Sequence, residues 1–412
     1  MRVLSVANAF PPVGHTGGAE VSSYHTCRGL IQQGVDCSVL VLNNRLFEPV
    51  DEWYELDGIP VHRVAHRVPR SALTDVFDPW IYQVTKTELR RLKPDLVHVH
   101  NVSGATLAPY LACRSVAIPV VNTLHDLWLL CPNNMLYRRN GSFCDPRQAP
   151  HGCRDCFRRY DFWANIPYRR RVFAALTSSV KAFISPSQAL IDRHVEAGYA
   201  AERFRMIAHG FREPEPQDSP CFRLAGVLAT VPAYRTVVFA GGGHENKGAS
   251  VLLQALPTLF RRVERLRVIV AGGGEKRILG GFRQYAPGVQ VLGVVPFVDM
   301  RALFALADLT IVASVCHESS SVVIYESFQA GTPVVGSQFG AIPELIQDGE
   351  TGYLFPVSAP MALAEAITLH FSRRAFERRR MRQRCVEEVR TRLALENHIR
   401  EIKKVYQEVL NG

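Results

Sequence analysis

The segment SVCHESSSVVIYESFQAGTPVVGSQFGAIPELIQDGETGYLF, residues 314–355, decides the fold of the second half of this chain. The run DLTIVAS at 308–314 is apolar and β-branched, and it has the length of a buried parallel strand. The run SSSVVIYESFQA at 319–330 predicts a helix that capping serines begin and Gly331 ends. A strand, a short loop and a helix in this order predict a parallel α/β unit.

The spacing of two glutamates in this unit suggests a binding site. The N-terminus of such a helix lies at the carboxyl edge of the sheet, where unpaired backbone N–H groups attract an anion. Glu318 precedes the helix, and Glu326 lies about a turn and a half into it, where a carboxylate can accept hydrogen bonds from a diol such as ribose. Phosphate together with sugar hydroxyls indicates a nucleotide or a nucleotide sugar. Taken singly, the two glutamates would instead be a solvated loop residue and a surface helix residue.

The stretch from His317 to Phe355 resembles the donor-binding segment of the retaining glycosyltransferases of family 4 (glycosyl transferases group 1), which have the GT-B fold. The matching features are the two glutamates, Gly-Thr-Pro-Val-Val at 331–335, Pro-Glu at 343–344 and the Asp-Gly-x-x-Gly turn that ends at Gly352. The resemblance implies that Glu318 lies beside the donor sugar and that Glu326 binds the ribose. It also implies that amides between them hold the diphosphate, namely those of Ser320, Ser321 and Val322.

The same resemblance implies an α/β fold of two doubly wound, Rossmann-like domains that face each other across a cleft. Two domains also agree with the length, since 412 residues exceed the size at which one core stops growing. A segment rich in proline and polar residues indicates the linker. The predicted parts are an N-terminal acceptor-side domain at 1–208, the linker at 209–233, a C-terminal nucleotide-sugar-binding domain at 234–390 and a helix at 391–412 that crosses back to the first domain.

Both halves alternate apolar strand candidates with helical stretches, which predicts doubly wound parallel sheets. In the first half the predicted strands are RVLSVAN, DCSVLVLN, PVHRVA, DLVHVHN, PVVNTLH, AFISPS and FRMIAH, and the predicted helices lie near 18–33, 76–92, 103–115, 165–178 and 187–197. In the second half the predicted strands are YRTVVFAGGG, RVIVAGGG, VQVLG, DLTIVAS, PVVGS and GYLFP.

Basic residues dominate the charge, with a formal net charge of +10 that leaves room for an anionic partner. The run at 373–384 carries seven arginines, and Arg169, Arg170 and Arg171 form a second cluster. The longer run is either a solvated helix face or a contact with a phosphate-bearing or membrane-bound acceptor. The arginine clusters would also suit peripheral contact with a membrane surface. Nucleic acid is not expected, because no zinc-finger spacing, RNA-binding aromatic motif or heptad-linked basic region is present.

No apolar run of the sequence reaches the roughly eighteen residues of a membrane span. The start MRVLSVANAFPP has the pattern of a first strand and loop and not that of a signal peptide. We therefore expect a cytoplasmic protein.

A glycine pair follows the first predicted strand. Gly17 and Gly18 would let the backbone approach a ligand closely at the start of the next helix, although a simple tight turn explains such a pair equally well. Family 4 enzymes carry a similar Gly-Gly that faces the diphosphate across the cleft, which implies a donor-binding role for this loop.

Histidines lie at the ends of two predicted strands. In DLVHVHN, His98 is expected to be a hydrogen-bonded core residue, whereas His100 and Asn101 at the carboxyl end are candidates for acceptor contact. His125 follows the next strand. The sequence TLHD at 123–126 resembles the place where the family has a histidine beside the donor sugar, which implies a functional His125.

Four of the ten cysteines fall within 26 residues, and the last two of them form a C-x-x-C pair. They are Cys131, Cys144, Cys153 and Cys156. Four thiolates could hold a structural zinc that orders a loop poor in apolar residues, and such a site leaves no position for catalysis. The alternatives are four free thiols or two disulfides. The other six cysteines are expected to be mostly buried, small apolar residues.

Lys247 lies just before a glycine that begins a helix, in GGGHENKGASVLL at 241–253, and a lysine there can neutralise a departing diphosphate. The family usually has an arginine five or six residues earlier, where this chain has Gly242 and Gly241. Another arginine or lysine would have to supply that charge. The glycine clusters at 241–243 and 272–274 do not fit a dinucleotide fingerprint, because Asn246 and Arg277 replace the third glycine.

These features predict a retaining glycosyltransferase that moves a sugar from a nucleoside-diphosphate sugar to a hydroxyl of a glycan, a lipid-linked saccharide or a natural-product aglycone. Lys247, the helix N-terminus and the Gly17-Gly18 loop would hold the leaving diphosphate, with Glu318 and His125 at the donor sugar. No cofactor is expected for catalysis, since the chain has no Asp-x-Asp triplet. The alternatives are a nucleotide-sugar epimerase of the same architecture and a catalytically silent nucleotide-sugar-binding subunit, with a nicotinamide or flavin enzyme as a more distant one.

Overall fold

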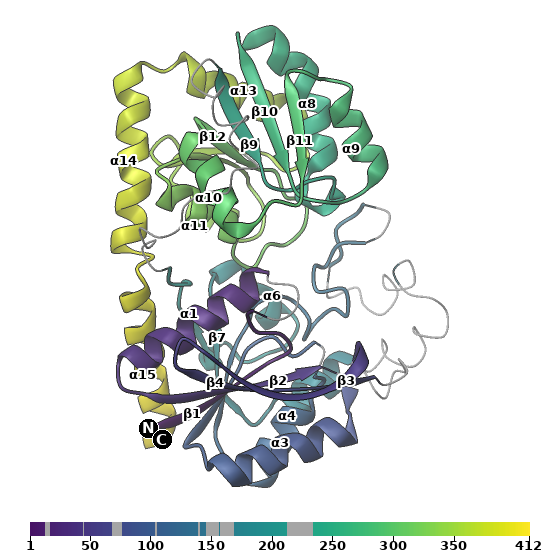
Figure 1. Ribbon diagram of the computed structural model, residues 1–412, viewed down its shortest axis with the longest axis vertical. Coiled ribbons are helices and arrows are strands. Elements are labelled where there is room, and N and C mark those ends of the chain that lie inside the picture. The colour runs from purple at the N-terminus through teal and green to yellow at the C-terminus, as the bar shows by residue number, and fades with distance from the viewer. Residues whose placement is uncertain are drawn as a thin grey trace. The chain divides into compact units, whose positions relative to one another are not determined.

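The computed structural model describes residues 1–12, 17–43, 45–67, 76–103, 105–138, 141–145, 156, 169–211 and 234–412. The chain divides into two compact units, one of Met1–Arg212 with Leu395–Gly412 and the other of Glu213–Ala394 (Figure 1). Each unit is built on its own sheet with helices on both faces. Among the residues described, no helix is both long enough and apolar enough to cross a lipid bilayer.

The first unit contains an eight-stranded sheet in the order β3-β4-β2-β1-β5-β6-β7-β8. Its strands are β1 (Arg2–Ala7), β2 (Asp36–Asn43), β3 (Arg45–Leu56), β4 (Ile59–Arg67), β5 (Leu96–Val99), β6 (Val120–Thr123), β7 (Val180–Ser185) and β8 (Phe204–Met206). Apart from the antiparallel pair β3–β4, neighbouring strands are parallel. The order reverses between β1 and β5, and such a reversal places a ligand-binding crevice at the carboxyl ends of these two strands.

Helices cover both faces of this sheet. They are α1 (Gly18–Gln32), α3 (Pro79–Leu92), α4 (Ala108–Ser115), α6 (Gln188–Glu196) and α15 (Leu395–Asn411), with a 3₁₀ turn η3 (Ala201–Arg203) and a helical segment at 169–176. Helices α3, α4 and α6 share one apolar core with the sheet, and α1 and α15 share the other. Figure 1 shows α15 beside α1. The two helices meet at Gly29, where a Cβ would lie 2.6 Å from Cγ1 of Ile399.

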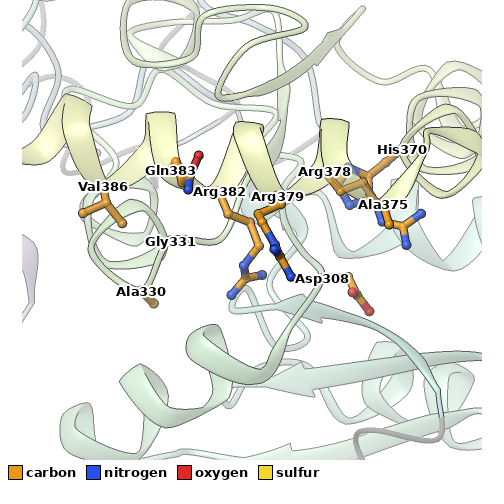
Figure 2. Close-up of a pocket in the computed structure, with 10 residues that line it drawn as sticks. All are labelled: Asp308, Ala330, Gly331, His370, Ala375, Arg378, Arg379, Arg382, Gln383 and Val386. Carbon is orange, nitrogen blue, oxygen red and sulfur yellow. The ribbon is translucent and has the colours of Figure 1, made fainter.

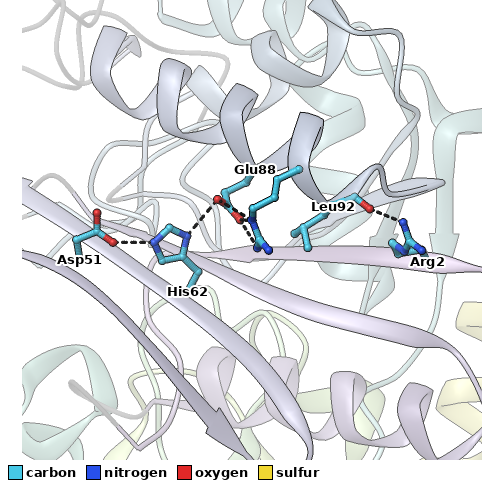
Figure 3. Close-up of polar contacts among 6 residues, drawn as sticks. Arg2, Asp51, His62, Glu88 and Leu92 are labelled. Atoms are coloured by element: carbon cyan, nitrogen blue, oxygen red, sulfur yellow. Dashed lines mark hydrogen bonds and ion pairs between the residues drawn. The ribbon is translucent and has the colours of Figure 1, made fainter.

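Polar contacts tie α3 to the edge of this sheet (Figure 3). His62 on β4 hydrogen-bonds Asp51 on β3 at 2.8 Å, and its other ring nitrogen lies 3.5 Å from the carboxylate of Glu88 on α3. At the end of α3, the Arg2 guanidinium donates to the carbonyl oxygen of Leu92 at 2.6 Å. Asp78 caps the start of the same helix by accepting from the backbone N–H of Trp80. These contacts fix α3 at both ends.

The second unit contains a six-stranded parallel sheet in the order β11-β10-β9-β12-β13-β14. Its strands are β9 (Arg235–Phe239), β10 (Leu266–Ala271), β11 (Val289–Gly293), β12 (Leu309–Val312), β13 (Val334–Ser337) and β14 (Gly352–Phe355). Its helices are η6 (Glu245–Lys247), α8 (Ala249–Arg262), α9 (Lys276–Arg283), α10 (Phe297–Leu306), α11 (Val322–Gln329), α12 (Ile342–Leu345), α13 (Pro360–Ser372) and α14 (Ala375–Thr391). The strand order reverses between β9 and β12, which marks the switch point of this sheet.

The sequence predicted two parallel α/β sheets, and the structure confirms this fold class. Three details differ. Strand β3 was not predicted, and it makes the edge of the first sheet antiparallel. Ser321 is the N-cap residue of α11, but its side chain makes no capping hydrogen bond. Arg169 is not available for the membrane contact expected of the arginine clusters, because its side chain is buried over the Phe173 ring and donates to the Trp128 carbonyl at 2.7 Å.

Candidate functional site

A small pocket lies at the carboxyl ends of β9 and β12, at the switch point of the second sheet. Its lining residues come from both strands and from the loops that follow them: Phe239, Ala240, Gly241, Lys247, Ile311, Val312, Ser314, Glu318, Ser321 and Val323. Its volume of about 40 Å³ is far below the roughly 300–1,000 Å³ of small-molecule sites, so a nucleotide sugar would extend beyond it.

Two predicted site residues meet in this pocket. Nζ of Lys247 lies 2.7 Å from Oε1 of Glu318, and the Ser314 hydroxyl donates to the same oxygen at 2.6 Å. Burial alone would raise the pKa of Glu318, but the Lys247 charge and these hydrogen bonds hold it below its ordinary value. The Glu318 charge in turn raises the pKa of Lys247. Both groups are therefore ionised near neutral pH, and the lysine side chain is 43% exposed and able to reach an anion.

Glycines allow the surrounding loops to approach one another. Gly248 follows Lys247 with φ of +79°, and a Cβ there would lie 1.9 Å from the carbonyl oxygen of Ala313 at the end of β12. Gly340 has φ of +57°, and a Cβ there would lie 2.9 Å from the backbone nitrogen of Glu318. The loops that carry the lysine and the glutamate are thus held against β12 and against each other by backbone contact.

The structure explains the absence of the family's usual arginine. At Gly242, with φ of +53°, a Cβ would lie 2.1 Å from the carbonyl oxygen of Gly273, and at Gly241 it would lie 2.3 Å from the Phe239 ring. The backbone N–H of Gly242 donates to Ala271 at 2.9 Å. Neither position accepts a larger side chain in this backbone. Of the pocket-lining residues that the structure describes, Lys247 is the one cation.

The start of α11 provides the predicted anion-binding amides. The helix begins at Val322, after Ser320 and Ser321, and it aims its first N–H groups toward the pocket end of β12. Because the Ser321 side chain leaves these groups uncapped, they can be satisfied by a ligand. Ser320 is engaged elsewhere, since its hydroxyl lies 2.9 Å from the Tyr325 hydroxyl.

Glu326 lies one turn further along α11, and its carboxyl group makes no hydrogen bond or ion pair with the part of the chain that the structure describes. Burial raises the pKa of its carboxyl group to about 8, with no neighbouring cation to lower it. A ligand that donates hydrogen bonds would stabilise this buried carboxyl group.

In the first unit, the predicted Gly17-Gly18 loop begins α1, at the switch point of its sheet. The backbone N–H of Gly17 donates to the Glu20 carboxylate at 2.9 Å. This contact uses a donor that was expected to face a phosphate, and it places the negative charge of Glu20 beside that donor. Residues 13–16 lie outside the described residues. The donor-binding role of Gly17 and Gly18 stays a prediction, with Glu20 as a competitor for the same N–H group.

Five histidines form one cluster in the first unit. They are His98, His100, His125, His209 and His398, and their ring centroids are 4.1 Å, 5.3 Å, 5.3 Å and 6.3 Å apart in that order. His100 Nδ1 lies 3.1 Å from His125 Nε2. Burial, with smaller contributions from neighbouring histidines for the first four, lowers the pKa of each ring, that of His98 to about 3 and that of His398 to about 4. The cluster is therefore neutral at pH 7.

The expectation that His98 is a hydrogen-bonded core residue is confirmed, since its ring lies 2.6 Å from the Tyr406 hydroxyl and 2.7 Å from Thr123 Oγ1. His100 is only 4% exposed, so it supports His125 more readily than it contacts an acceptor. The sequence interpretation missed His209, which stacks on His125 and lies 2.9 Å from the Ser22 hydroxyl. Its position directly after β8, in the run FRMIAH, was the available signal.

Asn101 and the cysteine loop have structural roles in the described residues. Asn101 accepts the backbone N–H of Ser103 at 3.1 Å through its side chain. Cys131 and Cys144 both pack against the apolar core below their loop. Cys153 lies outside the described residues, and among the residues described no three His, Cys, Asp or Glu side chains are arranged so that they could hold a metal ion, so the zinc ligand set stays a prediction. Five of the six other cysteines are buried as expected, and Cys221 lies outside the described residues.

Comparison with known proteins defines the class of this fold and then the family. A crystal structure of Anabaena Alr3699/HepE in complex with UDP-glucose matches 99% of this chain and 100% of that chain with a TM-score of 0.71 at 20% identity. At that identity the likeness establishes the GT-B fold alone. Two family models also match, "Glycosyltransferase Family 4" over residues 16–212 and "Glycosyl transferases group 1" over residues 234–372. The chain belongs to glycosyltransferase family 4.

Two curated relatives show how much of the chain is matched by sequence. A phosphatidyl-myo-inositol mannosyltransferase of Mycobacterium leprae is 32% identical over 203 residues, which are 47% of this chain and 54% of that protein. The chain thus spans about half the length of the curated relatives that it matches at this level. A D-inositol 3-phosphate glycosyltransferase of Paenarthrobacter aurescens is 24% identical over 372 residues, covering 87% of this chain and 85% of that protein.

Proposed function

We propose that this protein is a retaining glycosyltransferase that moves a sugar from a nucleoside-diphosphate sugar to a hydroxyl acceptor. The observation that carries the proposal is the convergence of Lys247, Glu318 and the uncapped start of α11 at the switch point of the second sheet. A cation and a helix N-terminus together match the two negative charges of a diphosphate. A family 4 chain with this arrangement has the parts that the reaction needs.

In the proposed reaction the bond between the anomeric carbon and the diphosphate oxygen breaks, and a bond to the acceptor oxygen forms. The leaving diphosphate takes both bonding electrons, so negative charge grows on its oxygens as the sugar becomes oxocarbenium-like. Lys247 and the first N–H groups of α11 are fixed in place before the reaction and stabilise this charge. The acceptor proton passes to a phosphate oxygen of the leaving group on the same face of the sugar.

Glu318 and Glu326 have separate proposed roles. Lys247 and Ser314 both contact Oε1 of Glu318, which leaves Oε2 for a hydroxyl of the donor sugar. Glu326 has no protein partner among the described residues and would accept hydrogen bonds from the ribose hydroxyls. His125, supported by His100 and His209, would contact the donor sugar. No step of this mechanism uses a metal, and the zinc proposed for the four cysteines would be structural.

The relatives suggest which acceptor class to test first. Relatives that act on phosphatidyl-myo-inositol and on D-inositol 3-phosphate make inositol-type hydroxyl acceptors the first to test. The neighbouring crystal structure with UDP-glucose makes UDP-hexoses the first donors.

The deciding experiment measures product formation from a panel of nucleotide sugars with inositol-containing and lipid-extract acceptors. Glycosylated acceptor together with released nucleoside diphosphate supports transfer. Conversion of the donor to an epimer without any acceptor would instead show an epimerase, and tight donor binding with no product from any acceptor would show a binding subunit. Lys247→Ala should remove product formation, while Lys276→Ala, on α9 and outside the lining of the pocket, serves as the matched control.

A further inference from the structure

A second, larger pocket lies in the C-terminal unit at the amino end of β12. It has a volume of about 470 Å³ and lies between α14, the end of α13 and the turn that follows α11 (Figure 2). Asp308 immediately precedes β12 and lines this pocket, whereas Ser314 and Glu318 follow β12 and line the candidate donor site. The two pockets therefore lie at opposite ends of one strand, and this one is not part of the site described above.

Three arginines from one side of α14 dominate the lining. They are Arg378, Arg379 and Arg382, which lie three and four positions apart and so share a helix face. Figure 2 shows Arg379 and Arg382 projecting from α14 on the side where Asp308 lies. The Asp308 carboxylate is engaged, since its Oδ2 accepts the backbone N–H of Thr236 at 2.9 Å. One carboxylate against three guanidinium groups leaves a net charge of +2 in the lining, without counting histidine.

The three arginine side chains differ in their hydrogen bonds to the protein. Arg382 donates to the carbonyl oxygens of Ala307 at 2.8 Å and Ala305 at 3.2 Å, where α10 ends, and Arg378 donates to the carbonyl oxygen of Arg373 at 2.8 Å. Helix capping thus explains these two positions. Arg379 makes no hydrogen bond, ion pair or ring contact with the described part of the chain, although it lines the same pocket. Capping does not explain Arg379.

A buried histidine also lies in the lining of this pocket. His370, at the end of α13, is 1% exposed and lines the pocket, and its Nδ1 atom has no hydrogen-bond partner among the described residues. Burial first, and then the charges of Arg378, Arg373 and Arg382, lower the pKa of this ring to about 3. The arginine contributions have the sign expected of a positively charged pocket wall.

We propose that this pocket binds a phosphate monoester group, presented either by a soluble phosphorylated compound or by a lipid headgroup. Arginines that are already fixed by backbone carbonyls offer preorganised, charge-assisted hydrogen bonds to phosphate oxygens, and Arg379 adds a guanidinium with all its donors unused. The volume exceeds that of a bare phosphate, so the group carried by the phosphate would also fit. The proposal does not depend on the function proposed for the donor site.

The test compares two variants of equal charge on the same exposed helix. Arg379→Gln removes the arginine that lines the pocket, and Arg380→Gln removes its neighbour, which does not line the pocket. Binding of inorganic phosphate is measured by calorimetry in the Lys247→Ala background, so that the candidate donor site contributes little. Binding to phosphatidylcholine vesicles with and without phosphatidate is measured alongside. Melting temperatures confirm that each variant is folded.

We expect Arg379→Gln to weaken phosphate binding about tenfold or more, as for loss of a hydrogen bond to a charged group, and Arg380→Gln to leave it unchanged. Binding of phosphatidate vesicles alone, with the same dependence on Arg379, would assign a lipid headgroup. Binding of free phosphate with no preference for these vesicles would assign a soluble compound. Equal effects of the two variants, no effect of Arg379→Gln, or no binding of either probe by the protein with both arginines intact would overturn the proposal.

Discussion

Nζ of Lys247 lies 2.7 Å from Oε1 of Glu318, although the two residues are 71 positions apart in the sequence. The contact joins the loop after β9 to the loop after β12, the two strands at which the strand order reverses. In the proposed reaction Lys247 would stabilise the leaving group, and Glu318 would orient the lysine. A diphosphate would compete with one carboxylate for a lysine that is still partly exposed, and the pair would become a network of three charged groups.

Donor affinity should depend on pH through Glu326. Burial raises the pKa of this carboxyl group to about 8, so the free protein holds it protonated at pH 7. An ionised carboxylate accepts hydrogen bonds from both hydroxyls of a ribose, so UDP should bind more tightly as the pH rises from 7 to 9. Glu326→Gln should weaken binding about tenfold at pH 9 and abolish this rise. Calorimetry at both pH values checks this. An equal rise in UDP affinity in the Glu326→Gln variant would show that Glu326 does not bind the ribose.

Stability should also reveal the raised pKa of Glu326. Its pKa in the folded protein lies above the ordinary value of 4.5, so the unfolded chain releases this proton at a lower pH than the folded protein does. The contribution of Glu326 to the free energy of unfolding therefore falls as the pH rises from about 4.5 to about 8. Between pH 6.5 and 8, above the range in which the buried histidines act, urea titrations should show a shallower decline for Glu326→Gln. If the free energy of unfolding depended on pH in the same way for both proteins, the pKa of Glu326 would not be raised by folding.

The backbone at Gly248 should tolerate no side chain. Its φ of +79° and the distance of 1.9 Å that would separate a Cβ from the Ala313 oxygen combine strain with a backbone clash. We expect Gly248→Ala to lower the free energy of unfolding by about 1–3 kcal/mol and to displace Lys247. Gly280→Ala is the control, because this helical glycine on α9 has no atom within 4 Å of the Cβ position and its substitution should be neutral or stabilising by up to ~1 kcal/mol. Equal behaviour of the two variants would contradict the packing described here.

The histidine cluster should make the first unit sensitive to acid. All five rings have a folded-state pKa below the ordinary 6.5, so below that pH the unfolded chain binds protons that the folded protein does not. Stability is therefore complete above about pH 6.5 and is lost as the pH falls, by roughly 1.4 kcal/mol per pH unit for each histidine. His209→Asn should reduce this slope by one histidine's share, measured by urea unfolding at pH 5, 6 and 7.5.

Substitution of the exposed His244, which is not in the cluster, is the matched control. His244→Gln should leave the slope of stability against pH unchanged. If neither substitution altered the slope, groups outside the histidine cluster would be responsible for the loss of stability in acid.

The proposed zinc site gives a stoichiometric test. Metal analysis of protein purified without chelators should find about one equivalent of zinc if Cys131, Cys144, Cys153 and Cys156 hold one ion by four thiolates. Cys153→Ser should release it, and Cys113→Ser, a buried core cysteine outside this set, should not. Less than about half an equivalent in the unmodified protein would indicate free thiols.

Local sequence signals accounted for much of the second unit. The strand, the serine-rich loop and the helix around Glu318 and Glu326 were predictable, because a buried parallel strand and a helix have different periodicities. The contact between Lys247 and Glu318 required the topology, since nothing local links residues 71 positions apart. Ser314 was missed for the same reason, as its bond to Glu318 depends on how the loop folds back.

The first unit shows where sequence interpretation failed. Strand β3 mixes polar and apolar residues, so it lacks the pattern of a buried strand, yet Asp57 and Gly58 after it both have positive φ, as a tight hairpin turn requires. That dipeptide was an available hairpin signal. Arg169 was assigned to an exposed cluster from composition, but its planar group packs on Phe173 in the core. His209 was assigned to the linker from the proline-rich, polar segment that it begins, and its stacking partner His125, 84 positions away, gave no local signal.

The central claim is that the second unit holds a nucleoside diphosphate between Lys247 and the start of α11. Calorimetric titration of UDP and other nucleoside diphosphates into the protein and its Lys247→Ala variant tests it most directly. We predict saturable binding of at least one nucleotide to the unmodified protein, with affinity lowered about 10²-fold or more in Lys247→Ala and unchanged in Lys276→Ala. Equal affinity in all three proteins, or no binding of any nucleoside diphosphate, would contradict the account.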